Sequence, residues 1–249
     1  MHLRMERESL EGTGMLANFW RLIKNLKFLQ LALYIIFAFF FLPSFGDRWL
    51  LELASGFLLL NVLLVSLSTV GAVRWRWLFW LLFAAAAVCH GIYLTQIGPG
   101  GRLLFIRLTI ICNMLLLLLC IGGILSYIFQ TIKVTLDTLF AAVVAYLIIA
   151  CTFTHAYLLL CTFNPQSLSI PLPLRMDSFN IFESNIIYYS LIVITTVGMG
   201  DILPLTPMAR ILTVVEAVVG QFFVAILMAW LVGRFIAQAI SAEKLESQD

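Results

Sequence analysis

Charged side chains are scarce in this chain: lysine, arginine, aspartate and glutamate make up 11% of its 249 residues, whereas hydrophobic residues make up 62%. A soluble domain could not cover so much apolar surface with so few charges. Several apolar runs also exceed about 18 residues, the length that indicates a membrane-spanning helix. The composition therefore excludes a soluble protein and predicts an all-α membrane protein that crosses the bilayer several times.

Cysteine is also sparse, and its spacing lacks the pairs typical of metal sites. Its five positions all lie in apolar surroundings (Cys89, Cys112, Cys120, Cys151 and Cys161). We expect buried thiols there rather than disulfides or metal ligands. No nucleophile–base pair and no metal-ligand cluster occurs at a usable spacing, so we expect no enzymatic activity and no cofactor. The net charge of +2 gives no reason to expect a nucleic-acid partner.

Six apolar runs predict six transmembrane helices. They lie near Leu26–Phe45, Trp49–Ala72, Trp77–Gln96, Leu103–Phe129, Val134–Phe163 and Met208–Ile240. An even number of spans puts both termini on one side, and most lysines and arginines fall on that side. The positive-inside rule then predicts cytoplasmic N- and C-termini. The segment between the last two runs is expected to face outward.

Polarity divides the chain into four expected parts. Residues 1–25 form a basic N-terminal segment at the cytoplasmic membrane surface, and residues 241–249 form a short cytoplasmic tail. Residues 26–130 hold the first four helices, and residues 131–240 hold the last two with their loop. A voltage sensor needs several arginines on its fourth helix, because each moving charge supplies only about 2.3 kcal/mol per 100 mV. Arg107 stands alone in that run, so we expect a mainly structural four-helix module.

The segment between the last two runs predicts a re-entrant pore loop. Residues 164–175 read NPQSLSIPLPLR, a loop too polar and kinked to span lipid. The apolar run that follows, SNIIYYSLIVIT, has only about a dozen residues, so as a helix it would cross roughly half a bilayer. Irregular backbone at membrane depth must be buried in protein or line a water-filled path. We therefore expect a half-length pore helix followed by a filter.

The string TTVGMGD at residues 195–201 supplies the chemistry of an ion filter. A dehydrated cation needs oxygen ligands in place of water, and backbone carbonyls provide them without added charge. Thr196 offers a hydroxyl and a carbonyl, while Gly198 and Gly200 permit backbone angles that other residues adopt only at a cost. Asp201 would attract cations at the outer mouth. The predicted ion-binding filter comprises Thr196, Val197, Gly198, Met199 and Gly200.

Residues 188–210, YYSLIVITTVGMGDILPLTPMAR, resemble the pore loop of tetrameric potassium channels, whose usual filter is T-V-G-Y-G-D. An aromatic pair and a serine stand where the simplest bacterial members carry two tryptophans and a serine, and a proline, a threonine and an arginine follow at the family's spacing (Pro204, Thr206 and Arg210). The resemblance covers residues 131–240. It implies a homotetramer in the lipid of the bacterial inner membrane that conducts K⁺ passively, with K⁺ as the permeant ion.

The resemblance also implies which residues support the filter. They are Tyr188, Tyr189, Ser190 and Thr195; Glu216 of the last span is added to them because of its depth in the membrane. An acid at this depth in a membrane is costly and suggests a function. We expect Glu216 to pair behind the filter with the pore helix; direct ion coordination in the cavity is the alternative.

Beyond the filter, the resemblance places a gating hinge at Gly220, 20 residues after Gly200. Close packing between membrane helices is the other explanation for a glycine there. Val224 and Met228, four residues apart on one face, are candidates for the cavity or inner gate. Gln221 could face the cavity or link helices.

One departure from the family affects the expected function. Met199 replaces the filter tyrosine, and a flexible thioether cannot brace the filter as a phenol does. We expect a potassium-selective channel. The alternatives are a weakly selective monovalent cation channel and a non-conducting membrane sensor or subunit with channel architecture.

Overall fold

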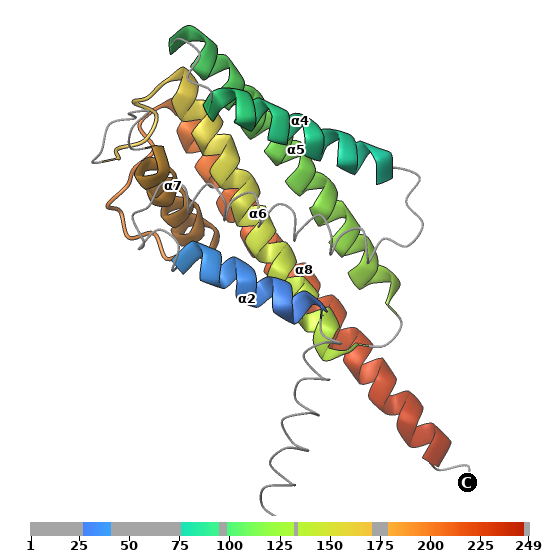
Figure 1. Ribbon diagram of the computed structural model, residues 1–249. Helices are drawn as coiled ribbons and strands as arrows, with labels where there is room; N and C mark the ends of the chain where they lie inside the picture. The colour runs from blue at the N-terminus through green and yellow to red at the C-terminus, as the bar shows by residue number, and fades with distance from the viewer. Residues whose placement is uncertain (1–26, 41–75, 95–98, 132–133, 171–178, 247–249) are drawn as a thin grey trace, which may run out of the picture.

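The computed structural model describes residues 27–40, 76–94, 99–131, 134–170 and 179–246, and its regular elements there are all helices. In chain order they are α2 (Lys27–Phe40), α4 (Arg76–Leu94), α5 (Pro99–Gln130), α6 (Leu136–Phe163), α7 (Phe179–Ile194) and α8 (Pro207–Glu246). Helix α6 lies at the centre, with α5 and α2 against it, while α8 runs behind it and the short α7 lies beside both, in contact with each (Figure 1).

Within the described residues, three helices are long and apolar enough to cross a membrane. Their apolar stretches are Leu103–Gln130, Leu136–Phe163 and Pro207–Ser241. Shorter apolar stretches occur in α4 and α7, at Trp80–Cys89 and Phe182–Ile194. The prediction of an all-α membrane protein is confirmed at this level. The predicted span at residues 49–72 lies outside the described residues, and the count of six stays a prediction.

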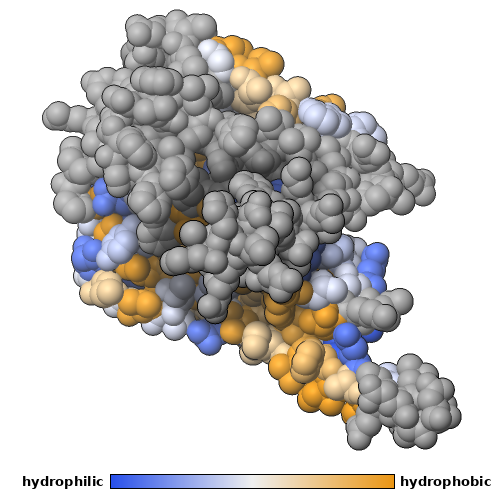
Figure 2. Space-filling model, turned by 60° about the horizontal axis from the view of Figure 1, so that its bottom comes forward, coloured by the Kyte–Doolittle hydropathy of each residue, from blue (hydrophilic) through white to orange (hydrophobic). Residues whose placement is uncertain are grey.

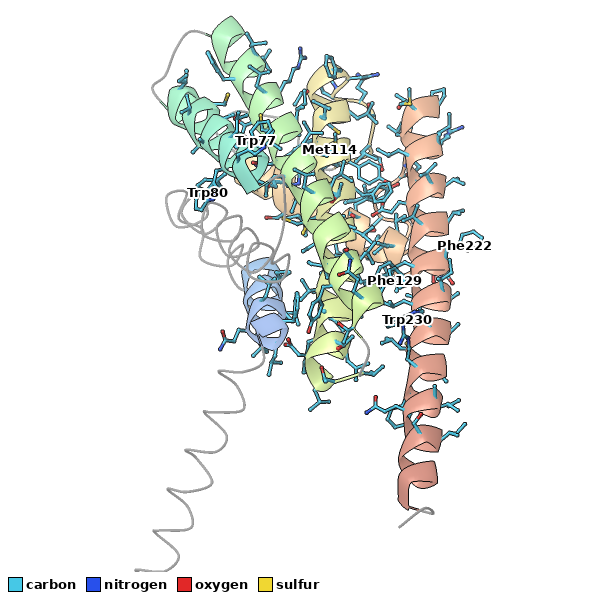
Figure 3. All side chains as sticks on the ribbon, turned by 90° about the vertical axis from the view of Figure 1, so that its right-hand side faces the viewer. Trp77, Trp80, Met114, Phe129, Phe222 and Trp230 are labelled. Carbon is cyan, nitrogen blue, oxygen red and sulfur yellow. The ribbon has the colours of Figure 1, made fainter. Side chains whose placement is uncertain are left out.

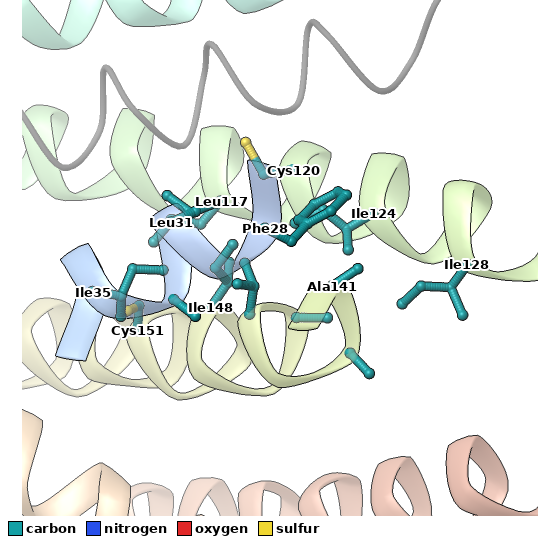
Figure 4. Packing of buried hydrophobic residues seen from close by; sticks show 14 of the residues in the cluster. Phe28, Leu31, Ile35, Leu117, Cys120, Ile124, Ile128, Ala141, Ile148 and Cys151 are labelled. Carbon is teal, nitrogen blue, oxygen red and sulfur yellow. The ribbon is translucent and has the colours of Figure 1, made fainter. Parts of the chain in front are cut away.

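Helix α2 docks into the angle between α5 and α6. Its Phe28, Leu31 and Ile35 recur at helical spacing and are almost fully buried. They meet one face of each neighbour (Leu117, Cys120 and Ile124 of α5; Ala141, Ile148 and Cys151 of α6), as Figure 4 shows. The Phe28 main-chain N–H also donates to Asp137 Oδ1 at 3.1 Å. The first predicted span thus packs on the helix that leads into the pore region.

Arg107 fastens α5 to the carboxyl end of α6. Its guanidinium donates to the Thr162 carbonyl at 2.6 Å and to Thr162 Oγ1 at 3.2 Å. The same group lies 4.0 Å from the ring centroid of Phe163. A cation is stabilised at a helix C-terminus by the exposed carbonyls. The positive charge of Arg107 is thus held in a fixed contact between α5 and α6.

Helix α8 contacts the rest of the chain along one narrow stripe. Its buried residues in the described range recur at spacings of seven and four (Ala209, Glu216, Gly220, Leu227 and Leu231). Other apolar side chains of α8 are exposed, and Phe222 points away from the protein while Trp230 faces Phe129 of α5 (Figure 3). Apolar atoms cover much of the arm formed by its C-terminal half (Figure 2). A single chain therefore leaves a broad apolar face of α8 uncovered.

Candidate functional site

The site is built at the carboxyl end of α7. This helix has 16 residues, so it is about 24 Å long, shorter than the roughly 30 Å hydrocarbon core of a bilayer. Phe182, Ile186 and Tyr189 recur at spacings of four and three and are buried in a cluster with residues of α6 and α8. That packing fixes the direction in which α7 delivers the chain that follows it.

Helix α7 ends in a Schellman motif. The Val197 N–H donates to the Ile192 carbonyl at 3.0 Å, and the Thr196 N–H donates to the Val193 carbonyl at 2.9 Å. The residue in the left-handed conformation that this motif requires is Thr196, with φ of 58°. Glycine is usual at this position, and a β-branched residue there is an outlier. Thr196, the first residue of the candidate filter, is therefore held in a strained conformation by the end of the helix.

The strained residue begins an alternating backbone. Positive φ recurs at every second position, with 58° at Thr196, 55° at Gly198 and 80° at Gly200, and is not found at Val197 or Met199. Positive φ is a conformation that glycine adopts readily and other residues adopt at a cost, so Gly198 and Gly200 suit this backbone and Thr196 does not. A Cβ at either glycine would meet nothing within 4 Å, so φ rather than space requires glycine there.

Residues 195–200 are all exposed in the single chain, Met199 by 67% of its surface. The described residues contain no group of three or more His, Cys, Asp and Glu side chains that could hold a metal ion. A cation at this site would be held by main-chain oxygens and the Thr196 hydroxyl.

The loop after α6 pairs with the chain that follows the candidate filter. Leu168 and Pro204 form an isolated antiparallel bridge, supported by hydrogen bonds of 2.9 Å from Ser169 N to the Leu203 carbonyl and from Leu205 N to the Ser167 carbonyl. The loop after α6 thus braces the exit of the filter. Nearby, the Asp201 carboxylate lies close enough to the Tyr188 hydroxyl to interact with it. Tyr188 and Asp201, two residues singled out by the sequence, are brought together.

Behind the filter, a buried polar network joins three helices. Glu216 of α8 is 0% exposed, with Oε1 2.5 Å from Ser190 Oγ of α7 and Oε2 2.7 Å from the Tyr157 hydroxyl of α6. Tyr189 contacts Thr213 Oγ1 at 2.7 Å. The expected pairing of Glu216 behind the filter thus has a specific partner in α7. Tyr157 was not predicted, because one tyrosine in an apolar helix carries no signal by itself.

Ile194, the last residue of α7, is held from two sides. The Tyr146 hydroxyl of α6 donates to its carbonyl at 2.8 Å. A Cβ added to Gly220 of α8 would lie 2.6 Å from Ile194 Cγ1 and 2.8 Å from the Ile194 carbonyl oxygen. Close packing therefore requires glycine at this position, and the gating hinge stays a prediction.

The remaining predicted residues lie on or near α8. Gln221 Nε2 is 3.5 Å from Thr196 Oγ1, which places its amide beside the first filter residue. Thr195 donates its hydroxyl back to the Leu191 carbonyl at 2.6 Å. Val224 and Met228 lie further along α8 and are exposed in the single chain. Nothing in the single chain assigns the last two a role at the gate.

Comparison with known proteins adds one finding. Residues 142–237 match a family model described as an ion channel. The matched range includes most of α6, all of α7, the filter string and most of α8. It confirms the resemblance noted for the pore loop and is consistent with a potassium channel. No curated protein and no solved structure matches the chain.

Proposed function

We propose that this chain, whose residues 142–237 match an ion-channel family model, forms a fourfold pore that conducts K⁺ passively and selectively across the membrane. The observation that carries the proposal is the alternating backbone from Thr196 to Gly200 at the end of a helix too short to cross the bilayer. Such a backbone offers peptide oxygens to a dehydrated monovalent cation without adding charge.

The position of α7 supports the same proposal. Its C-terminus, with the partial negative charge of a helix end, immediately precedes the filter and would favour a cation there. Adjacent carbonyl sites hold ions close enough to repel one another, so binding does not prevent exit. Asp201 follows the filter and adds an attractive charge at the mouth.

Assembly would complete the site. One chain supplies one filter segment, and a ring of carbonyls around an ion needs several segments on one axis. The exposed filter residues and the uncovered face of α8 are the surfaces that neighbouring copies would cover. Small oligomers close by rotational symmetry, and the pore-loop resemblance indicates four copies.

Potassium flux into liposomes that contain the purified full-length chain tests the proposal. Gly198→Ala should lower the flux at least about tenfold, because alanine in the left-handed conformation costs about 1–2 kcal/mol in each of four chains. Gly233→Ala on α8 is the matched control, since its Cβ would meet nothing within 4 Å and should leave the flux intact. Equal flux through both variants would contradict the filter assignment.

A weakly selective cation channel is the second candidate, and Met199 favours it. Its side chain makes no bracing contact in the single chain and is 67% exposed. Reversal potentials in mixed K⁺ and Na⁺ separate the two candidates. Under the main proposal, the wild type discriminates against Na⁺ and Met199→Tyr sharpens that discrimination. A wild type without conduction would instead indicate a sensor or subunit that retains the pore architecture.

A further inference from the structure

The hydrogen bonds around Glu216 indicate which oxygen atoms of the network carry protons. The carboxyl is fully buried between α6, α7 and α8 and is surrounded by hydroxyl groups. The titratable groups of the described residues on which Glu216 acts are tyrosines, Tyr146 and Tyr157 of α6 and Tyr189 of α7. No basic side chain of the described residues contributes at this carboxyl. Each hydroxyl carries one proton, so donors and acceptors can be counted.

Three of the hydroxyl protons are assigned by elimination. Thr213 donates to the Ala209 carbonyl at 2.8 Å, because a carbonyl can only accept. Tyr189 then donates to Thr213 Oγ1, which has used its own proton. Tyr157 lies 2.7 Å from Glu216 Oε2 and 3.4 Å from Thr213 Oγ1, so it donates to the carboxyl. None of these protons remains for the contact between Ser190 and Glu216.

Ser190 has one proton and two short contacts. Its Oγ lies 2.8 Å from the Ala150 carbonyl of α6 and 2.5 Å from Glu216 Oε1. The carbonyl cannot donate, so the serine proton goes to Ala150. The 2.5 Å contact then needs a second proton, and the carboxyl is the remaining group that can supply it.

An ionised Glu216 fits the same atoms poorly. The serine proton would then turn to the carboxylate and leave Ser190 Oγ 2.8 Å from the Ala150 oxygen with no hydrogen between them. That carbonyl already accepts from Thr154 Oγ1 at 3.0 Å, but an added lone-pair contact would still be repulsive. The carboxylate would also be a buried charge without a cation, which is costly in a membrane.

We infer that Glu216 is protonated and donates its carboxyl hydrogen to Ser190, which in turn donates to the Ala150 carbonyl. This directional chain links α8 to α7 and α7 to α6. Ser190 lies in α7 six residues before Thr196, so the chain sets the rotation of the helix that presents the filter. Glu216 is thus a positioning residue, and its protonated carboxyl is the form that holds α7 in place. Where ion conduction is the readout, this inference rests on the proposed function.

Infrared spectroscopy of the reconstituted full-length protein at neutral pH tests the proton directly. The wild type should show the carbonyl stretch of a buried protonated carboxyl, and Glu216→Gln should abolish that component. Glu183→Gln, on α7, is the control: any band that the Glu183 carboxyl contributes disappears in this variant, and the component assigned to Glu216 should stay. If Glu216→Gln does not fold, Ser190→Ala replaces it, because loss of the hydrogen-bond acceptor should shift the same band. A wild-type spectrum without this component overturns the inference.

Conduction supplies the second readout. Glutamine can donate to Ser190 and accept from Tyr157, so Glu216→Gln should keep the K⁺ flux within about threefold of the wild type. Glu216→Asp is acidic but shorter and should lose about tenfold, as a buried group left without its partner does. Flux restored by aspartate and not by glutamine would show that a charge is needed and would overturn the inference. If the wild type does not conduct, the proposed function fails, and the infrared result alone decides the proton.

Discussion

Gly220 shows at the scale of a residue how closely α8 approaches the end of α7. Gly220→Ala would force a Cβ to within 2.8 Å of the Ile194 carbonyl oxygen, which belongs to the backbone and cannot rotate away. We expect a loss of about 1–3 kcal/mol in the free energy of unfolding, as for other overpacked sites. Thermal unfolding of the purified protein in detergent measures it.

Gly233→Ala provides the comparison for that prediction. Both glycines lie in α8, but a Cβ at Gly233 would meet nothing within 4 Å, and alanine should slightly favour the helix. A hinge role predicts altered gating without a packing penalty. If Gly220→Ala is as stable as Gly233→Ala, the close packing has no energetic consequence.

Tyr146 supplies a second prediction at this scale. Tyr146→Phe removes the 2.8 Å hydrogen bond to the Ile194 carbonyl and leaves the ring in place. We expect the protein to lose about 0.5–1.5 kcal/mol in unfolding free energy, the net value of one such bond. The same substitution at Tyr188, which is exposed, should have a smaller effect on stability. Equal losses would argue that the tyrosine does not anchor the end of α7.

A candidate filter and several of its supports, Ser190 and Glu216 among them, could be proposed from sequence, whereas Tyr146 and Tyr157 could not. The threonine, glycines and acid of TTVGMGD indicate an ion filter through their residue types and spacing. Tyr157 contacts Glu216 across 59 positions of the chain, and Tyr146 contacts Ile194 across 48. Both tyrosines sit in an apolar run of α6 where nothing distinguishes them from other large side chains. Only the fold reveals what they meet.

At the scale of an element, the sequence predicted the end of α7 better than its start. The apolar run was expected from Ser184 to Thr195, whereas the helix begins five residues earlier, at Phe179, and ends at Ile194, one residue before the predicted end. The Schellman motif at that end could not be predicted, because Thr196 stands where glycine is usual. Strain stored at a candidate filter overrides local preference, as it does at functional sites generally.

Arg107 joins α5 to α6, and its substitution should weaken that contact. Its two hydrogen bonds to Thr162 and its position over Phe163 make it a fixed clamp. Arg107→Gln should lower the unfolding free energy by about 1.5–3 kcal/mol, the range for hydrogen bonds to charged groups. The steepness of conductance against voltage should not change. A shallower voltage dependence in this variant would show that Arg107 moves in the field.

At the scale of the whole molecule, the sequence predicted membrane helices but not their arrangement. Apolar runs are hydrophobic on every side, so they do not reveal which face meets protein and which meets lipid. The docking of α2 between α5 and α6, centred on Phe28, depends on how the side chains of the three helices fit together, which hydrophobic periodicity alone does not specify. The fold was also needed to show that only a narrow stripe of α8 is buried within the chain. The rest of that helix is available for contact with another surface.

The uncovered face of α8 gives the last prediction, which concerns assembly. Val214 of α8 and Val88 of α4 are matched in type and exposure, at 62% and 59%. If neighbouring copies cover α8, Val214→Trp overpacks that contact at a cost of about 1–3 kcal/mol in every chain and should dissociate the tetramer. Val88→Trp should leave it intact, because lipid accommodates a larger ring. Native mass spectrometry from detergent micelles counts the copies. A tetramer that survives Val214→Trp would place the subunit contact elsewhere, while a wild type that is monomeric would remove the ring of carbonyls on which ion conduction depends.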